Sequence, residues 1–354
     1  MGGKNMSGKR NLVRNGGLST PGTPLLRAVA FLAVVACVGF AGNAAAGDPL
    51  VRPGDRVSFF GDSSMGTHGY TCQVANVFAL GQGVEGVTFR ASVTEQLWRA
   101  LGTVNALPAI DCDVISVRPN VVCICFGLDD LQGKQFDKPA LTRFKQNLLD
   151  VVRRAKKSGA RVLLMTPACP TPPKHVDDVE EARKLANLVR EIAKSESLQW
   201  IDLFSAMTDI SERAQRAGKT LEWTAGPVLT PSGHALTMCL VLDALGVTPR
   251  ISLAELDLKA NTALGTHCSV TRPEKQDGTF TFKRADHCLP TAFPQSVHAA
   301  LEFLSVPHNW DSYRIKVAGL PAGSWRITVE GVVAGTFTAE ALAKGVDLGR
   351  SPGP

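Results

Sequence analysis

The sequence predicts an α/β fold in which helices cover a parallel β-sheet. Between Arg56 and Gly246, short β-branched runs alternate with longer amphipathic stretches, which is the pattern of such a fold. Two of the short runs are almost wholly apolar, as expected for central strands that are buried on both faces. The five predicted strands are Arg56–Gly61, Gly86–Arg90, Asn120–Phe126, Ala160–Thr166 and Leu198–Leu203.

The stretches between these strands have helical periodicity. Apolar residues recur at helical spacing over Lys138–Lys157, and a second helix is predicted at Val176–Lys194. A last helix is predicted from Pro231 to Leu245, before Gly246, because proline suits a first helical turn and glycine ends a helix.

From about Arg250 the alternation of strands and helices stops, and a smaller β-rich region is predicted. Tyr313–Val317 and Trp325–Val329 alternate apolar and polar residues and are joined by a segment rich in Gly and Pro, which predicts two short strands. The expected organisation is a leader at 1–46, an α/β domain at 50–248 and a small β-rich region at 251–354.

The N-terminus has the three parts of an export signal. Basic residues precede an uncharged apolar run from Ala28 to Ala41, and small residues follow at Ala44–Ala46. We expect cleavage after Ala46 and export to the periplasm or the extracellular space. Two alternatives stay open: lipid attachment at Cys37, and an uncleaved membrane anchor, although the run is shorter than the ~20 residues of a spanning helix.

The composition excludes bulk disorder and gives no sign of a nucleic-acid partner. Of the 354 residues, 44% are hydrophobic and 20% charged, which is enough apolar material for one sizeable core. The formal charge of +6 arises partly in the basic leader, so it is no evidence for nucleic-acid binding.

Neither the cysteines nor the histidines form a pattern that predicts a cofactor. Cys268 and Cys288 flank a turn-rich segment and are the best disulfide candidates among the nine cysteines. No CxxC pair with histidine partners occurs, and the spacing of the C-terminal His and Cys residues matches no compact metal site. We therefore expect no metal and no other cofactor.

The segment VSFFGDSS at 57–64 carries the clearest chemical signal. An apolar strand stops at Gly61 and delivers Asp62 and Ser63 into the turn before a helix. Ligand sites of open α/β sheets lie at such strand ends, and a glycine lets the backbone turn sharply there. Ser63 is thus placed like a nucleophile, although a Gly-Asp-Ser tripeptide fits a helix cap equally well.

Three segments resemble the conserved blocks of the SGNH/GDSL hydrolase family over about Asp55–Leu245. VSFFGDSS resembles the first block, Gly127-Leu128-Asp129-Asp130 after VVCICF the third, and TLEWTAGPVLTPSGHAL at 220–236 the fifth. The segment at 319–342 also resembles a tail of some secreted bacterial members. The resemblance implies a three-layer α/β/α sandwich, flavodoxin-like, with a parallel five-stranded sheet, and a serine that attacks esters.

The departures from the family pattern concern the groups that assist the serine. The resemblance implies a fifth-block His and Asp, but Val228 and Ala225 occupy these positions. The third-block Asn that donates to the oxyanion is Asp129, and a carboxylate accepts rather than donates. The second-block Gly falls near FRAS at 89–92, where Ala91 or Ser92 stands. Only the serine is intact, with Gly127 as the remaining residue of the oxyanion turn.

Three histidines are candidates for a replacement base. His175 follows TPACPTPPK, a loop that leaves the carboxyl end of the fourth strand, and is the best candidate. His68 and His234 are weaker candidates, and in the family the residue matching His234 is commonly structural. Asp62 and Asp130 are expected to bind loop amides and fix the turns.

Two function hypotheses follow. The first is an exported SGNH/GDSL-type esterase for acyl or acetyl esters of carbohydrate or lipid, with weak or no activity because its catalytic set is degraded. The second is a non-catalytic secreted protein that binds a glycan, lipid or protein at the same strand ends. A purely structural envelope protein is a third hypothesis.

Overall fold

The computed structural model describes residues 8–14, 41–42, 49–65, 69–93, 95–96, 99–100, 102–131, 135–171, 177–294, 297–298, 300, 302–304 and 309–349. The chain divides into two compact units. An α/β unit comprises Gly39–Thr248 and Phe293–His308, and a β-rich unit comprises Met1–Val38, Pro249–Ala292 and Asn309–Pro354. Residues 293–308, which we expected in the β-rich region, thus lie with the α/β unit.

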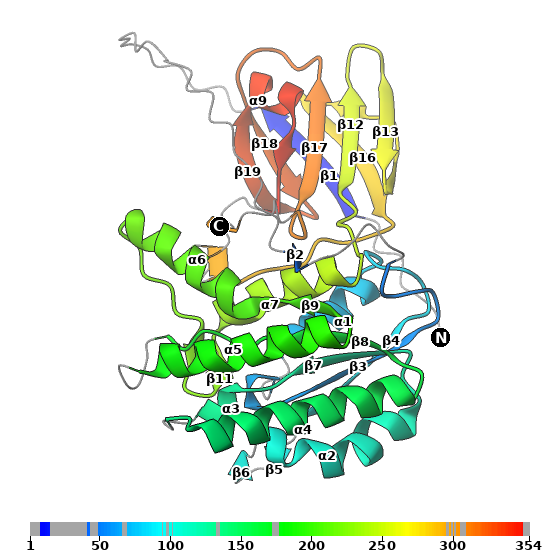
Figure 1. Cartoon of the computed structure of the whole chain (residues 1–354). Coiled ribbons are helices and arrows are strands. Elements are labelled where there is room, and N and C mark those ends of the chain that lie inside the picture. The colour runs from blue at the N-terminus through cyan, green and yellow to red at the C-terminus, as the bar shows by residue number, and fades with distance from the viewer. Residues whose placement is uncertain are drawn as a thin grey trace. The chain divides into compact units, whose positions relative to one another are not determined.

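Five parallel strands form the sheet of the α/β unit, which confirms the predicted fold (Figure 1). The strand order is β4-β3-β7-β8-β9, and the two-residue strand β2 (Ala41–Gly42) adds antiparallel to β9. The largest difference from the predicted bounds is in β4, which runs three residues beyond Arg90. The bounds are β3 Arg56–Gly61, β4 Thr88–Val93, β7 Val121–Cys125, β8 Arg161–Met165 and β9 Gln199–Ile201.

Helices cover both faces of this sheet, which gives three layers (Figure 1). The long helices α4 and α5 cover one face, and α1 and α7 pack against each other on the opposite face. The five longer helices are α1 Gly69–Ala79, α4 Lys138–Lys157, α5 Asp178–Ser195, α6 Leu203–Arg216 and α7 Pro231–Ala244. The shorter elements are α2 Ala106–Ala109, α3 Leu128–Leu131, and the two-stranded hairpins β5 Glu95–Gln96 with β6 Arg99–Ala100 and β10 Thr224–Ala225 with β11 Val228–Leu229.

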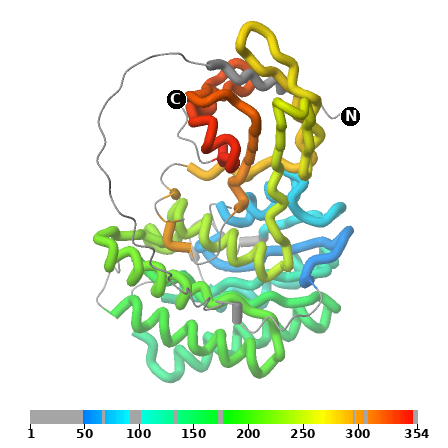
Figure 2. The backbone as a smooth tube through the Cα atoms, turned by 90° about the horizontal axis from the view of Figure 1, so that it is seen from above, coloured from blue at the N-terminus to red at the C-terminus, as the bar shows by residue number. Residues whose placement is uncertain are grey.

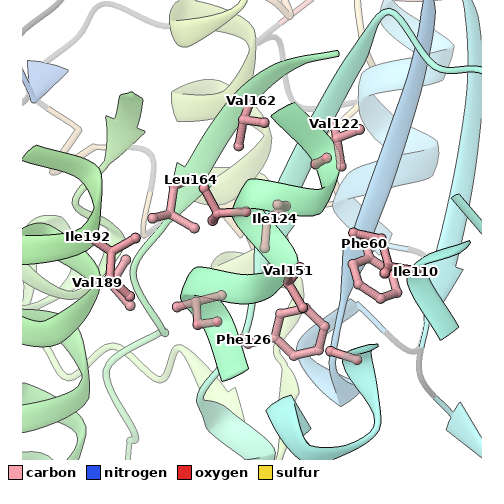
Figure 3. Packing of buried hydrophobic residues seen from close by; sticks show 14 of the residues in the cluster. Phe60, Ile110, Val122, Ile124, Phe126, Val151, Val162, Leu164, Val189 and Ile192 are labelled. Atoms are coloured by element: carbon pink, nitrogen blue, oxygen red, sulfur yellow. The ribbon is translucent and has the colours of Figure 1, made fainter. Parts of the chain in front are cut away.

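The core beneath α4 and α5 is built from the strands that the sequence marks as wholly apolar. Val122 and Ile124 of β7, Leu164 of β8, Val151 of α4 and Val189 of α5 belong to one buried apolar cluster (Figure 3). All five residues of β7 are buried, because helices lie on both sides of this central strand.

Local capping explains where two of the helices begin. The Asp137 side chain accepts the Ala140 N–H at 2.7 Å before α4, and Thr230 accepts the Gly233 N–H at 3.1 Å before α7. Both are N-cap bonds followed by a proline in the first turn. In the described part of the chain, no helix has the length and apolar character needed to cross a membrane.

The β-rich unit is a sandwich of two sheets (Figures 1 and 2). One sheet has the order β13-β12-β17-β20, and the other has the order β14-β16-β1-β18-β19 with β15 also paired to β16. The strands are β1 Gly8–Arg14, β12 Ser252–Asp257, β13 Thr262–Thr266, β14 Cys268–Val270, β15 Glu274–Gln276, β16 Thr279–Asp286, β17 Tyr313–Ala318, β18 Ser324–Val329, β19 Val332–Thr338 and β20 Val346–Asp347, and the short helix is α9 Ala339–Lys344.

Cys268 and Cys288, the best disulfide candidates, are free thiols in this structure. Each side chain is buried and donates to a backbone carbonyl at 3.2 Å, Cys268 to Leu253 and Cys288 to Arg250. Cys268 pairs with Asp286 in the ladder, and Cys288 follows two residues after Asp286.

Candidate active site

The strand order brings Ser63 and Asp129 together beyond the carboxyl ends of two neighbouring strands. β3 lies between β4 and β7, so the connections that leave β3 and β7 run to opposite sides of the sheet. In open α/β sheets, ligands bind beyond the carboxyl ends of the strands at such a switch point. Ser63 opens the 3₁₀ turn Ser63–Met65 after β3, and Asp129 lies in α3 after β7.

Asp62 ties the two turns together. Its Oδ2 accepts the N–H groups of Gly127 at 2.8 Å, Leu128 at 2.9 Å and Asp129 at 3.2 Å. Its Oδ1 accepts the Ser64 N–H at 3.0 Å. Gly127 has φ +130°, in the region that favours glycine. The Gly127 N–H is therefore used to hold the turn.

The ionisation of Asp62 is controlled by burial and by a neighbouring acid. Burial, and then the charge of Asp129, raise the pKa of Asp62 to about 7. The hydrogen bonds from Ser64 act in the opposite direction, because donors favour the charged form. Two carboxyl groups thus share a buried site.

Asp129 accepts hydrogen bonds from both donors of Ser63. The Ser63 hydroxyl donates to Asp129 Oδ2 at 2.8 Å, and the Ser63 backbone N–H donates to the same oxygen at 2.9 Å. Both residues are buried, with 7% and 3% exposure. The carboxylate therefore occupies the position from which an oxyanion would receive the serine N–H.

Asp130 binds a segment that the sequence did not identify. It accepts the Thr103 N–H at 3.1 Å and the Thr103 hydroxyl at 2.9 Å. Gly102 has φ +40°, and a Cβ there would meet the Asp130 carboxyl. Asp130 thus fixes the segment at Gly102 to the turn after β7.

Ala91 and Ser92, which were expected to stand at the second-block position after the strand, do not lie at a strand end. Ala91 and Ser92 lie within β4, paired with Phe59 and Phe60 of β3. The strand continues to Val93, so these residues precede the strand end and belong to the ladder. The reason is that β4 extends beyond the predicted Arg90.

His234, which lies within the segment that resembles the fifth block, has a structural role. Its Nδ1 accepts the Tyr70 N–H at 3.1 Å, which joins the start of α7 to the start of α1. Burial lowers the pKa of His234 to about 4. A Cβ on Gly69 would meet the imidazole ring, so the ring packs directly on the backbone. His175 and His68 lie outside the described residues.

The hairpin β10–β11 carries Ala225 and Val228, which the sequence predicts to stand at the family's Asp and His positions. Ala225 and Val228 are directly paired across it, and β11 packs beside the turn that begins at Ser63. The hairpin is anchored, since the Trp223 N–H donates to the Thr171 hydroxyl at 2.6 Å and the Thr171 N–H donates to the Thr224 hydroxyl at 2.9 Å. Neither Ala225 nor Val228 has a side chain that can carry a proton.

Comparison with known proteins identifies the family. Residues 59–221 match the model of the GDSL-like lipase/acylhydrolase family. The α/β unit thus contains a GDSL-like lipase/acylhydrolase domain over these residues. The match ends before Ala225, and therefore before the fifth-block hairpin. The family assigns the domain to the hydrolases of acyl esters.

Solved structures are similar to this chain at low sequence identity. The structure described as BT4096, a gut microbial diltiazem-metabolizing enzyme, is 17% identical with a TM-score of 0.65, and the match covers 85% of this chain and 74% of that one. Axe2, an acetylxylan esterase from Geobacillus stearothermophilus, is 18% identical with a TM-score of 0.46 over 55% of this chain and 96% of that one. The acetyl xylan esterase AlAXEase is 20% identical with a TM-score of 0.45 over 53% and 98%. No curated protein matches the chain in sequence.

Several contacts of the site have no sequence signal. Thr103 lies in a 3₁₀ turn and Thr171 in the segment after β8. No motif marks either side chain, and only the folded chain brings them to Asp130 and to the hairpin. The Asp129 contact could have been expected from the third-block position, because a carboxylate there faces the serine. Within the described residues, no group of three or more His, Cys, Asp or Glu is arranged to hold a metal ion.

Proposed function

We propose that this chain is an ester hydrolase with a degraded catalytic set, which hydrolyses acyl or acetyl esters of carbohydrate or lipid slowly or not at all. The observation that carries the proposal is that one carboxylate oxygen, Asp129 Oδ2, accepts both the Ser63 hydroxyl and the Ser63 N–H. An attacking serine needs a base for its proton, and the developing oxyanion needs donors. Asp129 supplies a negative charge where a donor is required.

The lack of a base and the lack of an oxyanion donor each lower the rate so far that we expect little or no turnover. In a serine protease, removal of a triad member lowers kcat by about 10⁴–10⁶. Loss of one oxyanion donor lowers kcat by about 10²–10³. The two effects are not additive, but either alone reduces a hydrolase to a small part of its rate. A carboxylate is also a weaker base than the imidazole it would have to replace.

The test combines turnover with covalent labelling. Purified protein is incubated with short-chain p-nitrophenyl esters and with a serine-directed phosphonate, and Ser63→Ala is the matched control. We expect the same low rate from both proteins and no labelling of either. Rapid hydrolysis and labelling that Ser63→Ala abolishes would show that a base acts on Ser63 and would overturn the proposal.

A second candidate is a non-catalytic binding protein that uses the same strand ends. It is favoured by the complete hydrogen bonding of Asp62 and by the Asp130–Thr103 bonds, which keep the turns built although the catalytic pair is absent. A thermal shift with acetylated oligosaccharides and short acyl lipids tests it. A ligand-induced rise in melting temperature without hydrolysis supports binding, and no rise with any of them contradicts it.

We also propose that the chain is exported and that cleavage follows Ala46. The support is the order of basic leader, apolar run and small-residue exit at Ala44–Ala46. The intact mass of the protein recovered outside the cytoplasm tests this. A mass that begins at Gly47 is expected, and a mass that includes residues 1–46 contradicts cleavage.

A further inference from the structure

The chain returns to the α/β unit after it has entered the β-rich unit. Residues Phe293–His308 belong to the α/β unit, although they stand in sequence between two stretches of the β-rich unit, Pro249–Ala292 and Asn309–Pro354. The family match ends at residue 221, so this return segment lies outside it. We call its described residues 293, 294, 297, 298, 300 and 302–304 the strap.

Apolar side chains fix the strap to the start of α7. Val297 and Ala235 are fully buried and form one apolar cluster, and Phe293 and Leu304 pack against it. Ala235 lies near the start of α7, shortly after the N-cap Thr230. Removal of the strap would expose this apolar surface to water, which is unfavourable. The strap therefore stabilises the beginning of the helix.

A charged side chain fixes the strap to the residues that follow α6. The Glu302 carboxylate lies 2.5 Å from the Lys219 ammonium, and this ammonium also lies 5.4 Å from the centroid of the Phe303 ring. Lys219 and Glu302 are both largely exposed, so the ion pair contributes less than the apolar cluster. Lys219 precedes the hairpin β10–β11 in sequence and Ala235 follows it. The strap thus contacts both ends of the segment that carries the hairpin.

The hairpin is joined to the start of α7 through the backbone. The Thr230 N–H donates to the Trp223 carbonyl at 2.9 Å, and the Thr230 hydroxyl donates to the Glu222 carbonyl at 2.6 Å. A Cβ on Gly233 would meet the Trp223 carbonyl oxygen, so the helix and the base of the hairpin are in direct backbone contact. β11 in turn packs beside the turn that begins at Ser63. A shift of the start of α7 would therefore move the hairpin relative to the serine.

We propose that the strap is a conformational device that holds the hairpin β10–β11 beside Ser63, and that release of the strap lets the hairpin move away from the serine. The inference rests on the proposed function only in treating Ser63 as the centre of the site. The chain on both sides of the strap belongs to the β-rich unit. That unit is thus linked covalently to both ends of the segment that holds the hairpin in place.

Hydrogen exchange followed by mass spectrometry tests the strap in the full chain. Val297→Asp places a charge in the buried cluster and should release the strap. Exchange is compared between residues 220–236, which hold the hairpin and the start of α7, and residues 138–157, which form α4. Val297→Ile keeps an apolar side chain and is the matched control. Val152→Ala, in the core beneath α4, controls for a general loss of stability.

We expect Val297→Asp to raise the exchange rate of residues 220–236 at least about tenfold and to leave that of residues 138–157 unchanged. Val297→Ile should exchange like wild type, and Val152→Ala should not raise exchange selectively in residues 220–236. If Val297→Asp fails to fold, Val297→Ala provides the test, with a selective rise of about threefold or more.

Two results would overturn the inference. If the strap loses its protection while residues 220–236 keep the wild-type exchange rate, the hairpin is held without the strap. An equal rise in residues 220–236 and 138–157 would show general destabilisation and no selective release of the hairpin. Ester turnover does not enter these readouts, so this inference and the proposed function can fail separately.

Discussion

Acidification should destabilise the α/β unit through one residue, His234. Its Nδ1 accepts the Tyr70 N–H at 3.1 Å, and the residue is 6% exposed. A protonated imidazole has a donor at both nitrogens, so protonation would break this bond and place a charge in a buried position. Protonation would therefore weaken the contact between α1 and α7.

The pKa of His234 sets how much free energy of unfolding is lost on acidification. Burial lowers the pKa of His234 from 6.5 to about 4. The folded pKa lies below the unfolded one, so the unfolded state binds the proton first. The resulting stability is present above pH 6.5 and is lost as pH falls toward 4. At about 1.4 kcal/mol per pKa unit, the loss is about 3 kcal/mol.

The assay is urea-induced unfolding, followed by circular dichroism, at several pH values between 7.5 and 4.5. His234→Gln keeps an acceptor for the Tyr70 N–H and does not titrate, so its unfolding free energy should depend less on pH, by up to about 3 kcal/mol over this range. His287→Gln, at an exposed position, is the matched control and should keep the wild-type dependence. The same pH dependence in His234→Gln and wild type would refute the reasoning.

Two further predictions concern buried charges. Asp129→Asn removes the charge that is the second cause of the raised pKa of Asp62, so that pKa should fall. A carboxyl whose pKa is raised in the folded state makes the unfolding free energy decline as pH rises toward 7. The unfolding free energy of this variant, relative to wild type, should therefore increase between pH 5 and 8, by about 1.4 kcal/mol for each unit by which the pKa of Asp62 falls. A difference that stays constant with pH would contradict this prediction. Arg284→Leu removes a fully buried guanidinium that donates to Asp286 at 2.7 Å and to Ser252 at 2.5 Å, and should cost about 3–5 kcal/mol in thermal unfolding. A loss below about 1 kcal/mol would show that Asp286 is satisfied without it.

The sequence predicted the α/β unit well because its signals are local. Lys138–Lys157 was predicted with the bounds that the structure has, since its apolar spacing, its Asp137 cap and its basic last turn all favour one helix. β7 was predicted from an apolar run that is buried throughout. The N-terminal strand β1 was missed, because its pairing with β16 and β18 joins segments more than 260 residues apart, and no local pattern records such a partner.

The site could be predicted in its place but only partly in its contacts. The Gly61 turn placed Ser63 at a strand end, and the third-block turn placed Asp129 at the neighbouring one. The bond between Ser63 and Asp129 depends on β3 and β7 being adjacent, which the sequence does not state. Ala91 was misplaced because β4 has no glycine or proline to mark its end, whereas β3 stops at Gly61.

The central proposal is that Ala225, Val228 and Asp129 deprive Ser63 of the base and the oxyanion donor that the family has at these positions, and restoring both groups tests it most directly. Asp129→Asn, Ala225→Asp and Val228→His are combined in one chain, where the hairpin register places the new Asp beside the new His. Hydrolysis of p-nitrophenyl acetate is then measured for wild type, for the restored chain, and for each with Ser63→Ala. We predict a wild-type rate no higher than that of its Ser63→Ala variant and a restored rate at least about 10²-fold higher. A wild-type rate equal to that of the restored chain, and lost with Ser63→Ala, would contradict the account.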